Sequence, residues 1–239
     1  MPRPAMRNHL PVACGSAPRS SNACERSQRR RFAVFLRIVL LSVAFGCAAP
    51  AFAQAAGVDL GERRRTFTPG EMALVPEYCQ FQQGDPRRDT PRGRYYMSVL
   101  GPALDDIHHY CRGLRDMMFA RTLSLRPEHK RALWERAVQE IDYVIKRNPP
   151  TLVLMPELFY RRGEAMIELG RLDEAQLAFE RSRALKPDYW PAYTRWADYL
   201  VEMKRIDEAR ALLQEGAKQA PDSAELQQRL SRLGSGKTP

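Results

Sequence analysis

Apolar residues in the second half of the chain recur at helical spacing. Between residues 102 and 122 they lie three or four positions apart and share one helix face: Leu104, Ile107, Cys111, Leu114 and Met118. A second stripe ends at Asn148-Pro149-Pro150, because proline cannot continue a helix. The pattern therefore predicts helices throughout the chain from residue 102 onward.

The residues before this helical half have no regular apolar period. Residues 54–70 contain glycine, proline and a run of arginines, and we expect a flexible linker there. Residues 71–100 are interrupted by Pro76, Pro86 and Pro91, which argue against long helices. They also carry several aromatic side chains, too many for a linker. We expect an ordered but irregular N-terminal segment packed on the first helices.

Residues 156–223 repeat with a period of 34 and without a gap. Leu172-Asp173-Glu174-Ala175 recurs as Ile206-Asp207-Glu208-Ala209, and Pro187 recurs as Pro221. Each copy is long enough for two helices, and its proline marks the end of the second helix. One helical hairpin cannot bury its own apolar face, so the copies are expected to stack on their neighbours.

Small residues hold matching places in the two copies. Gly163 in the first copy and Ala197 in the second are expected where the two helices of a hairpin approach each other. Ala175 and Ala209 have the same role on the second helix of each hairpin. A larger side chain at any of these positions would clash with the facing helix.

This pattern resembles the tetratricopeptide repeat family, which has a 34-residue period. The matching residues are Gly163, Gly170, Ala175, Phe179 and Pro187 in the first copy, then Ala197, Ala209 and Pro221 in the second. Arg162 and Gly216 depart from the pattern, where an apolar residue and an alanine are usual. The resemblance implies an all-α fold, a short right-handed α-solenoid of helical hairpins.

The resemblance also divides the chain after residue 100 into successive units. They are a degenerate hairpin (101–155), two repeats (156–189 and 190–223), a polar capping helix (224–233) and a disordered tail (234–239). The degenerate hairpin has Gly113 at its close-approach position. About three stacked units are the minimum for a stable array, so these units are enough to form one.

Basic charge is concentrated near the N-terminus. The chain has 38 Lys and Arg against 28 Asp and Glu, a formal net charge of +10. Eight arginines and one glutamate lie within residues 1–53, so the remainder carries only +3. A basic patch for nucleic acid is therefore not indicated, and we expect no nucleic-acid partner.

Residues 1–53 have the three parts of a secretory signal. Arg29-Arg30-Arg31 is followed by an uncharged, largely apolar run at 38–49, then by Ala51-Phe52-Ala53. Cleavage after Ala53 would leave a periplasmic or secreted protein without a stable membrane span. Two alternatives stay open, namely an uncleaved membrane anchor and a lipoprotein cleaved before Cys47.

Cleavage would leave two cysteines, Cys79 and Cys111. Two cysteines in an oxidising compartment predict one disulfide. His108 and His109 adjoin Cys111, so an accessory subunit of a redox or metal-handling system is the alternative hypothesis. The cysteines form no Cys-x-x-Cys pair and nothing supplies an oxyanion hole. We therefore expect no bound metal, no cofactor and no catalytic residue.

In tetratricopeptide arrays the first helix of each unit lines a concave groove, and the resemblance places ligand contacts on its outer face. The candidate positions are Tyr160, Glu164, Ile167, Glu168, Thr194, Asp198, Val201 and Glu202. This acidic stripe favours a ligand with positive charge or free peptide N–H groups, and a merely solvated face is the alternative. We expect a non-enzymatic scaffold for a protein or peptide partner, with envelope assembly or polysaccharide export as candidate settings.

Overall fold

The computed structural model describes residues 67–234 and contains only helical elements within them. Every described residue belongs to a single compact unit of the chain. The expected signal, most of the expected linker and nearly all of the expected tail lie outside the described residues. No described helix is both long and apolar enough to cross a bilayer.

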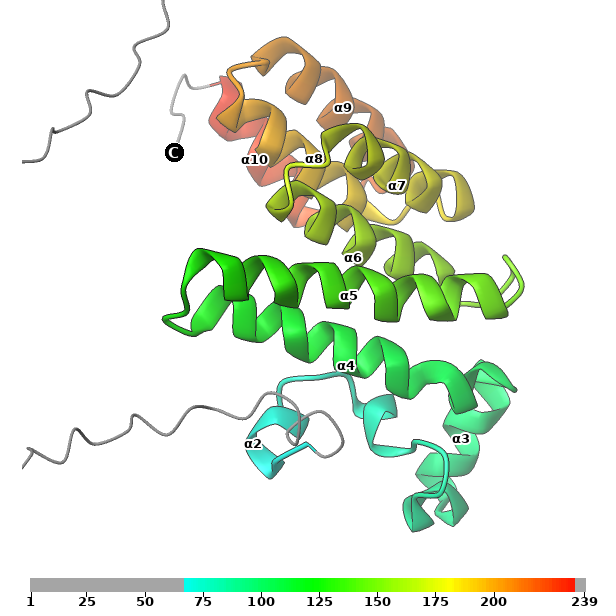
Figure 1. Cartoon of the computed structure of the whole chain (residues 1–239). Helices are drawn as coiled ribbons and strands as arrows, with labels where there is room; N and C mark the ends of the chain where they lie inside the picture. Colours follow the sequence, from blue (N-terminus) through cyan, green and yellow to red (C-terminus); the bar gives the residue numbers. More distant parts are fainter. Residues whose placement is uncertain (1–66, 235–239) are drawn as a thin grey trace, which may run out of the picture. The chain divides into compact units, whose positions relative to one another are not determined.

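Seven longer helices follow one another along the described chain (Figure 1). They are α4 (Ala103–Thr122), α5 (Pro127–Arg147), α6 (Met155–Glu168), α7 (Leu172–Leu185), α8 (Trp190–Glu202), α9 (Ile206–Gln219) and α10 (Ala224–Gly234). The helices pack as consecutive hairpins, α4 with α5, α6 with α7 and α8 with α9, while α10 lies against α8 and α9. The predicted all-α array of stacked hairpins is confirmed.

The small residues lie where the helices of each hairpin meet. A Cβ atom added to Gly163 would lie 2.8 Å from the Phe179 ring, closer than carbon atoms can approach. Ala175, Ala197 and Ala209 are fully buried. These contacts explain why the 34-residue pattern repeats small residues at these positions, since the backbones could not approach so closely around larger ones.

The structure explains both departures from the family pattern. A Cβ atom on Gly216 would lie 2.7 Å from Cγ of Tyr193, so the tyrosine ring fills the space that an alanine would need. Arg162 donates from Nε to Oδ1 of Asp142 at 2.8 Å. The guanidinium thereby joins α6 to the preceding hairpin by an ion pair, where an apolar side chain would pack instead.

Replacing Ala209 by leucine is expected to lower the free energy of unfolding by about 1–3 kcal/mol, because the added carbons overpack a closed contact. Ala211 lies two residues further along α9 and is exposed, so Ala211→Leu is a matched control with little expected effect. Chemical denaturation of both variants checks this. Equal stability of the two variants would contradict the burial of Ala209 between the helices of its hairpin.

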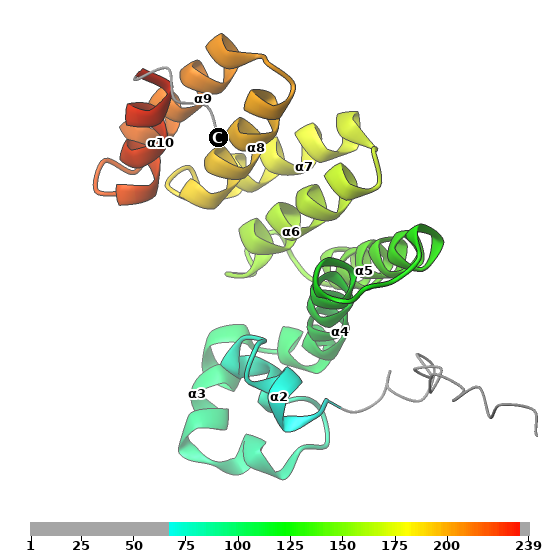
Figure 2. The same cartoon turned by 90° about the vertical axis from the view of Figure 1, so that its left-hand side faces the viewer.

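Four short elements precede the array. They are α2 (Pro69–Met72), η2 (Glu77–Gln80), η3 (Pro86–Asp89) and α3 (Pro91–Leu100). Figures 1 and 2 show α4 between α5 and these elements, and both η2 and α3 contact α4. The N-terminal segment therefore packs on the first hairpin, on the side of α4 opposite α5.

This segment is more helical than its prolines suggested. The expected linker extended to residue 70, but α2 begins at Pro69 and has a capping box between Thr68 and Glu71. Pro91 was expected to interrupt structure, yet it lies in the first turn of the ten-residue helix α3, after the cap Thr90. Proline fits the first turn of a helix because the N–H it lacks has no partner there.

Candidate functional site

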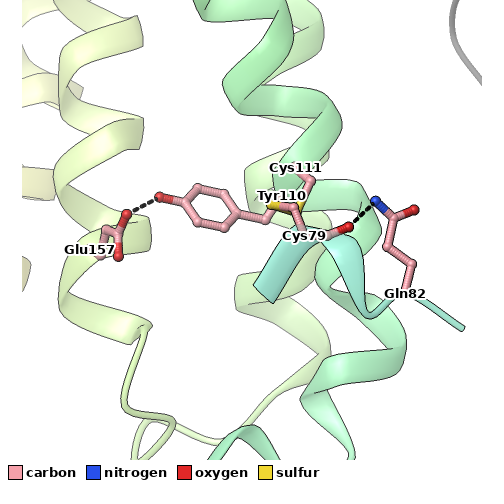
Figure 3. Close-up of a disulfide and its surroundings, with 5 residues drawn as sticks. All are labelled: Cys79, Gln82, Tyr110, Cys111 and Glu157. Atoms are coloured by element: carbon pink, nitrogen blue, oxygen red, sulfur yellow. Dashed lines mark hydrogen bonds between the residues drawn. A yellow bond between two sulfur atoms is a disulfide. The ribbon is translucent and has the colours of Figure 1, made fainter. Parts of the chain in front are cut away.

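A disulfide attaches the N-terminal segment to the array. Cys79 in η2 and Cys111 in α4 are bonded at an Sγ–Sγ distance of 2.07 Å, with their Cα atoms 5.8 Å apart (Figure 3). Both residues are fully buried. The bond closes a loop across 32 positions of sequence and fixes the segment on the face of α4 that carries its apolar stripe.

The covering segment, residues 67–81, occupies the part of the concave face that belongs to the first hairpin. Gly113 of α4 and Gly163 of α6 are both close-approach glycines, so Tyr110 matches Tyr160, a candidate groove position. Tyr110 is fully buried. Leu74, Val75 and Pro76 of the covering segment line a cavity of about 220 Å³ with side chains of α4 and with Arg161 of α6. The covering segment therefore takes up this end of the groove except for that cavity.

Buried tyrosines close the boundary between the covering segment and α6. Tyr110 donates a hydrogen bond from its hydroxyl to Oε1 of Glu157 at 2.7 Å (Figure 3). Burial raises the pKa of Tyr110 and of Tyr78 well above the ordinary range, so both rings stay neutral. The hydrogen bond from Tyr110 to Glu157 therefore joins α4 to α6 beside the covering segment.

Glu164, at the centre of the candidate stripe, is buried. Only 7% of its side chain is exposed, and its carboxylate pairs with Arg121 at 3.1 Å and with Arg161 at 2.8 Å. Beside it, burial raises the pKa of Tyr160 to about 12. The negative charge of Glu164 is therefore neutralised inside the chain.

Asp198, the matching acid of the second repeat, is also engaged. Arg229 of α10 donates from Nε to Oδ1 at 2.9 Å and from Nη2 to Oδ2 at 3.0 Å. This two-point contact ties the capping helix to α8. The acidic stripe therefore does not present, at its two central carboxylates, the free negative charge that the sequence suggested.

The other six candidate positions differ in exposure. Thr194 is buried and donates from Oγ1 to the Pro191 carbonyl oxygen at 3.1 Å, so its hydroxyl stabilises α8. The partly exposed positions are Tyr160, Ile167 and Val201, and the exposed ones are Glu168 and Glu202. The surface left open to a ligand therefore combines two exposed glutamates with partly exposed tyrosine, isoleucine and valine side chains.

Two adjoining cavities lie on the open part of the groove. One of about 470 Å³ has walls from α8, α9 and α10, including Val201, Leu213 and Leu233. The other, of about 410 Å³, has walls from α6, α8 and α10 and the Tyr189 turn, including Tyr160 and Trp190. Arg195, Asp198 and Arg229 line both cavities, so the two form one groove across α8.

Comparison with known proteins identifies the repeat. Residues 166–233 match the family model described as the tetratricopeptide repeat. This part of the chain is a tetratricopeptide repeat array. Members of the family generally act as non-catalytic scaffolds that bind other proteins. No curated protein matches the chain.

The histidines of this repeat protein lie away from the groove residues. His109 places Nδ1 2.5 Å from Oε2 of Glu140 and stacks on Tyr143 with ring centres 3.7 Å apart. Burial lowers the pKa of His108, whose Nδ1 lies 2.8 Å from the Asp105 carbonyl oxygen. Within residues 67–234 no three His, Cys, Asp or Glu side chains are grouped to hold a metal ion. His109 thus links α4 to α5 by polar and ring contacts.

Sequence reasoning missed the arginines of the groove. Arg161, Arg195 and Arg229 line the cavities, but none belongs to the candidate stripe. The stripe was placed at the positions that family members use for ligands. For residues 224–233 the sequence predicted only a polar helix that caps the array. The available signal was Arg229 and Arg232 on α10, three residues apart and therefore on one helix face.

Proposed function

We propose that this protein is an exported, non-catalytic scaffold that binds a protein partner along the open part of its concave groove. The observation that carries the proposal is the pair of adjoining cavities over α6, α8 and α10, the larger lined by apolar side chains as well as charged ones and the smaller mainly by polar and aromatic ones. The covering segment lies over the first hairpin, which favours a partner that lies across the two regular repeats and the capping helix.

Export is supported by two independent features. The basic, apolar and small residues of 29–53 have the order of a secretory signal, although they lie outside the described residues. The paired Cys79 and Cys111 suit an oxidising compartment. Envelope assembly or polysaccharide export, where scaffolds join several components outside the cytoplasm, are the settings we propose.

N-terminal sequencing of the protein recovered from a bacterial periplasm is expected to begin at Gln54. Cleavage after Ala53 removes the arginine-rich region and the apolar run together. A mature chain that begins at a lipidated Cys47, or one that retains residues before 40, would contradict this form of export.

A substitution that places a large side chain in the larger cavity tests whether the partner binds in the groove. Val201 lines the larger cavity and Leu177 lies on α7, outside both cavities, with 64% of its surface exposed. A partner captured from periplasmic extract by the oxidised wild-type chain is expected to be lost with Val201→Arg and retained with Leu177→Arg. Retention by both variants would place the interaction outside the groove.

A further inference from the structure

Three aromatic side chains line the smaller cavity of the open groove, namely Tyr160, Tyr189 and Trp190. The rings of Tyr160 and Tyr189 meet edge to face, with centroids 5.8 Å apart and planes at 72°. Trp190 is the first residue of α8, and 38% of its surface is exposed, whereas Trp134 and Trp196 are buried. A large aromatic ring is therefore open to solvent at this cavity, together with two rings that pack on each other.

The charged side chains of the smaller cavity are already paired. Each has a partner of opposite charge within the described chain, in the pairs Arg229–Asp198, Arg229–Glu225, Arg161–Glu164 and Arg195–Glu168. An ionic ligand would have to separate one of these pairs, so the cavity does not favour a ligand with net charge. The paired groups still have hydrogen-bonding capacity, since a guanidinium carries several N–H donors and a carboxylate several lone pairs.

The tyrosines add neutral hydrogen-bonding groups to this wall. Burial raises the pKa of Tyr160 and of Tyr189, so both hydroxyls stay protonated. A protonated hydroxyl both donates and accepts hydrogen bonds. The cavity therefore combines donors, acceptors and aromatic faces without an uncompensated charge.

A neutral saccharide matches this combination. Each hydroxyl of a pyranose ring donates and accepts hydrogen bonds, as the paired charges and the tyrosines require. The C–H groups on the face of the same ring carry a slight positive charge and pack on the negative face of an aromatic ring. An apolar ligand would instead leave the polar groups of the wall without water and without a partner, which is unfavourable.

We propose that the smaller cavity is a saccharide-binding site, in which a neutral hexose unit of a glycan packs on Trp190 and bonds to polar side chains of α6, α8 and α10. The site does not rest on the protein partner proposed above, which has the larger cavity beside Val201. Arg195, Asp198 and Arg229 line both cavities, so a glycan and a protein would lie next to each other over α8. The inference adds a carbohydrate ligand to the scaffold.

The probes are three neutral hexasaccharides, maltohexaose, cellohexaose and chitohexaose, with binding to the oxidised full chain measured by saturation-transfer-difference NMR. At least one is expected to bind, with the strongest saturation at ring C–H protons. Added NaCl should leave its Kd unchanged, because salt screens only interactions between charges.

Trp190→Ala is expected to weaken this binding at least about fivefold, because it removes both the buried area and the face of the ring. Trp190→Phe retains an aromatic face and should retain most of the affinity. Tyr95→Ala is the matched control, because Tyr95 is 51% exposed on α3 and lines neither cavity. Val201→Arg should also leave saccharide binding intact, because Val201 lines only the larger cavity.

The outcomes separate the saccharide site from the protein-binding groove. Failure of all three hexasaccharides to bind would overturn the site, as would equal affinity of wild type and Trp190→Ala at an unchanged melting temperature. Binding of the acidic hexagalacturonate alone, weakened by salt, would also overturn it, since an arginine would then be open to anions. Loss of saccharide binding in Val201→Arg would contradict a separate site, whereas retention of the protein partner by that variant would count only against the proposed scaffold groove.

Discussion

Replacing both Cys79 and Cys111 by alanine is expected to lower the free energy of unfolding by about 3–4 kcal/mol. The bond spans 32 positions, and the chain-entropy model assigns that amount to a loop of this length. For a domain of this size the melting temperature should fall by about 7–14 °C. Thermal unfolding of wild type with and without reductant, beside the double variant, measures the change.

The loss of stability in the double variant is expected to affect the covering segment more than the repeats. The covering segment contacts the array at α4, where the disulfide lies, so its amides are expected to exchange hydrogen faster in the double variant, while those of residues 190–223 stay protected. Reductant should have no further effect on the double variant, which serves as the control. A wild-type chain isolated from the periplasm with two free thiols, or an unchanged melting temperature, would contradict the structural role of the bond.

Replacing Glu164 by lysine is expected to cost about 3–5 kcal/mol, the amount typical when one partner of a buried ion pair is lost. Only 7% of the Glu164 side chain is exposed, and the new ammonium would lie between Arg121 and Arg161. Three like charges would then share one partly desolvated site. Urea denaturation followed by circular dichroism measures the effect.

Glu168 provides the control for this variant. It lies one turn further along α6, 39% of its side chain is exposed, and its ion pair with Arg195 is long. The change Glu168→Lys is therefore expected to alter stability by less than about 1 kcal/mol. If Glu164→Lys were as stable as Glu168→Lys, Glu164 would be a surface contact of the groove, as the sequence alone suggested.

The repeat could be predicted because its physical requirements are local in sequence. Gly163 and Ala175 are small since two backbones meet there, and a 34-residue shift brings each onto its counterpart. Pro187 ends its helix through its own ring and missing N–H. Residue types, periodicity and spacing therefore carried enough information to identify the helical hairpins.

The candidate groove was less predictable because its charges depend on contacts between distant residues. The bond between Asp198 and Arg229 joins positions 31 apart, and Arg121 reaches Glu164 across 43. No helical period reveals which acid an arginine of another helix will neutralise. The sequence predicted that the N-terminal segment packs on the first helices, but not that residues 67–81 cover the groove side of the first hairpin, because that depends on how they pack in three dimensions.

We propose that a partner occupies the open groove over α6, α8 and α10. Site-specific photo-cross-linking in the periplasm tests it most directly, with the photoreactive residue at Val201 or Trp190 in the groove and at Leu177 outside it. We expect one cross-linked protein that is shared by the two groove positions and absent from Leu177. Cross-linking from Leu177 alone, or different products at Val201 and Trp190, would contradict it.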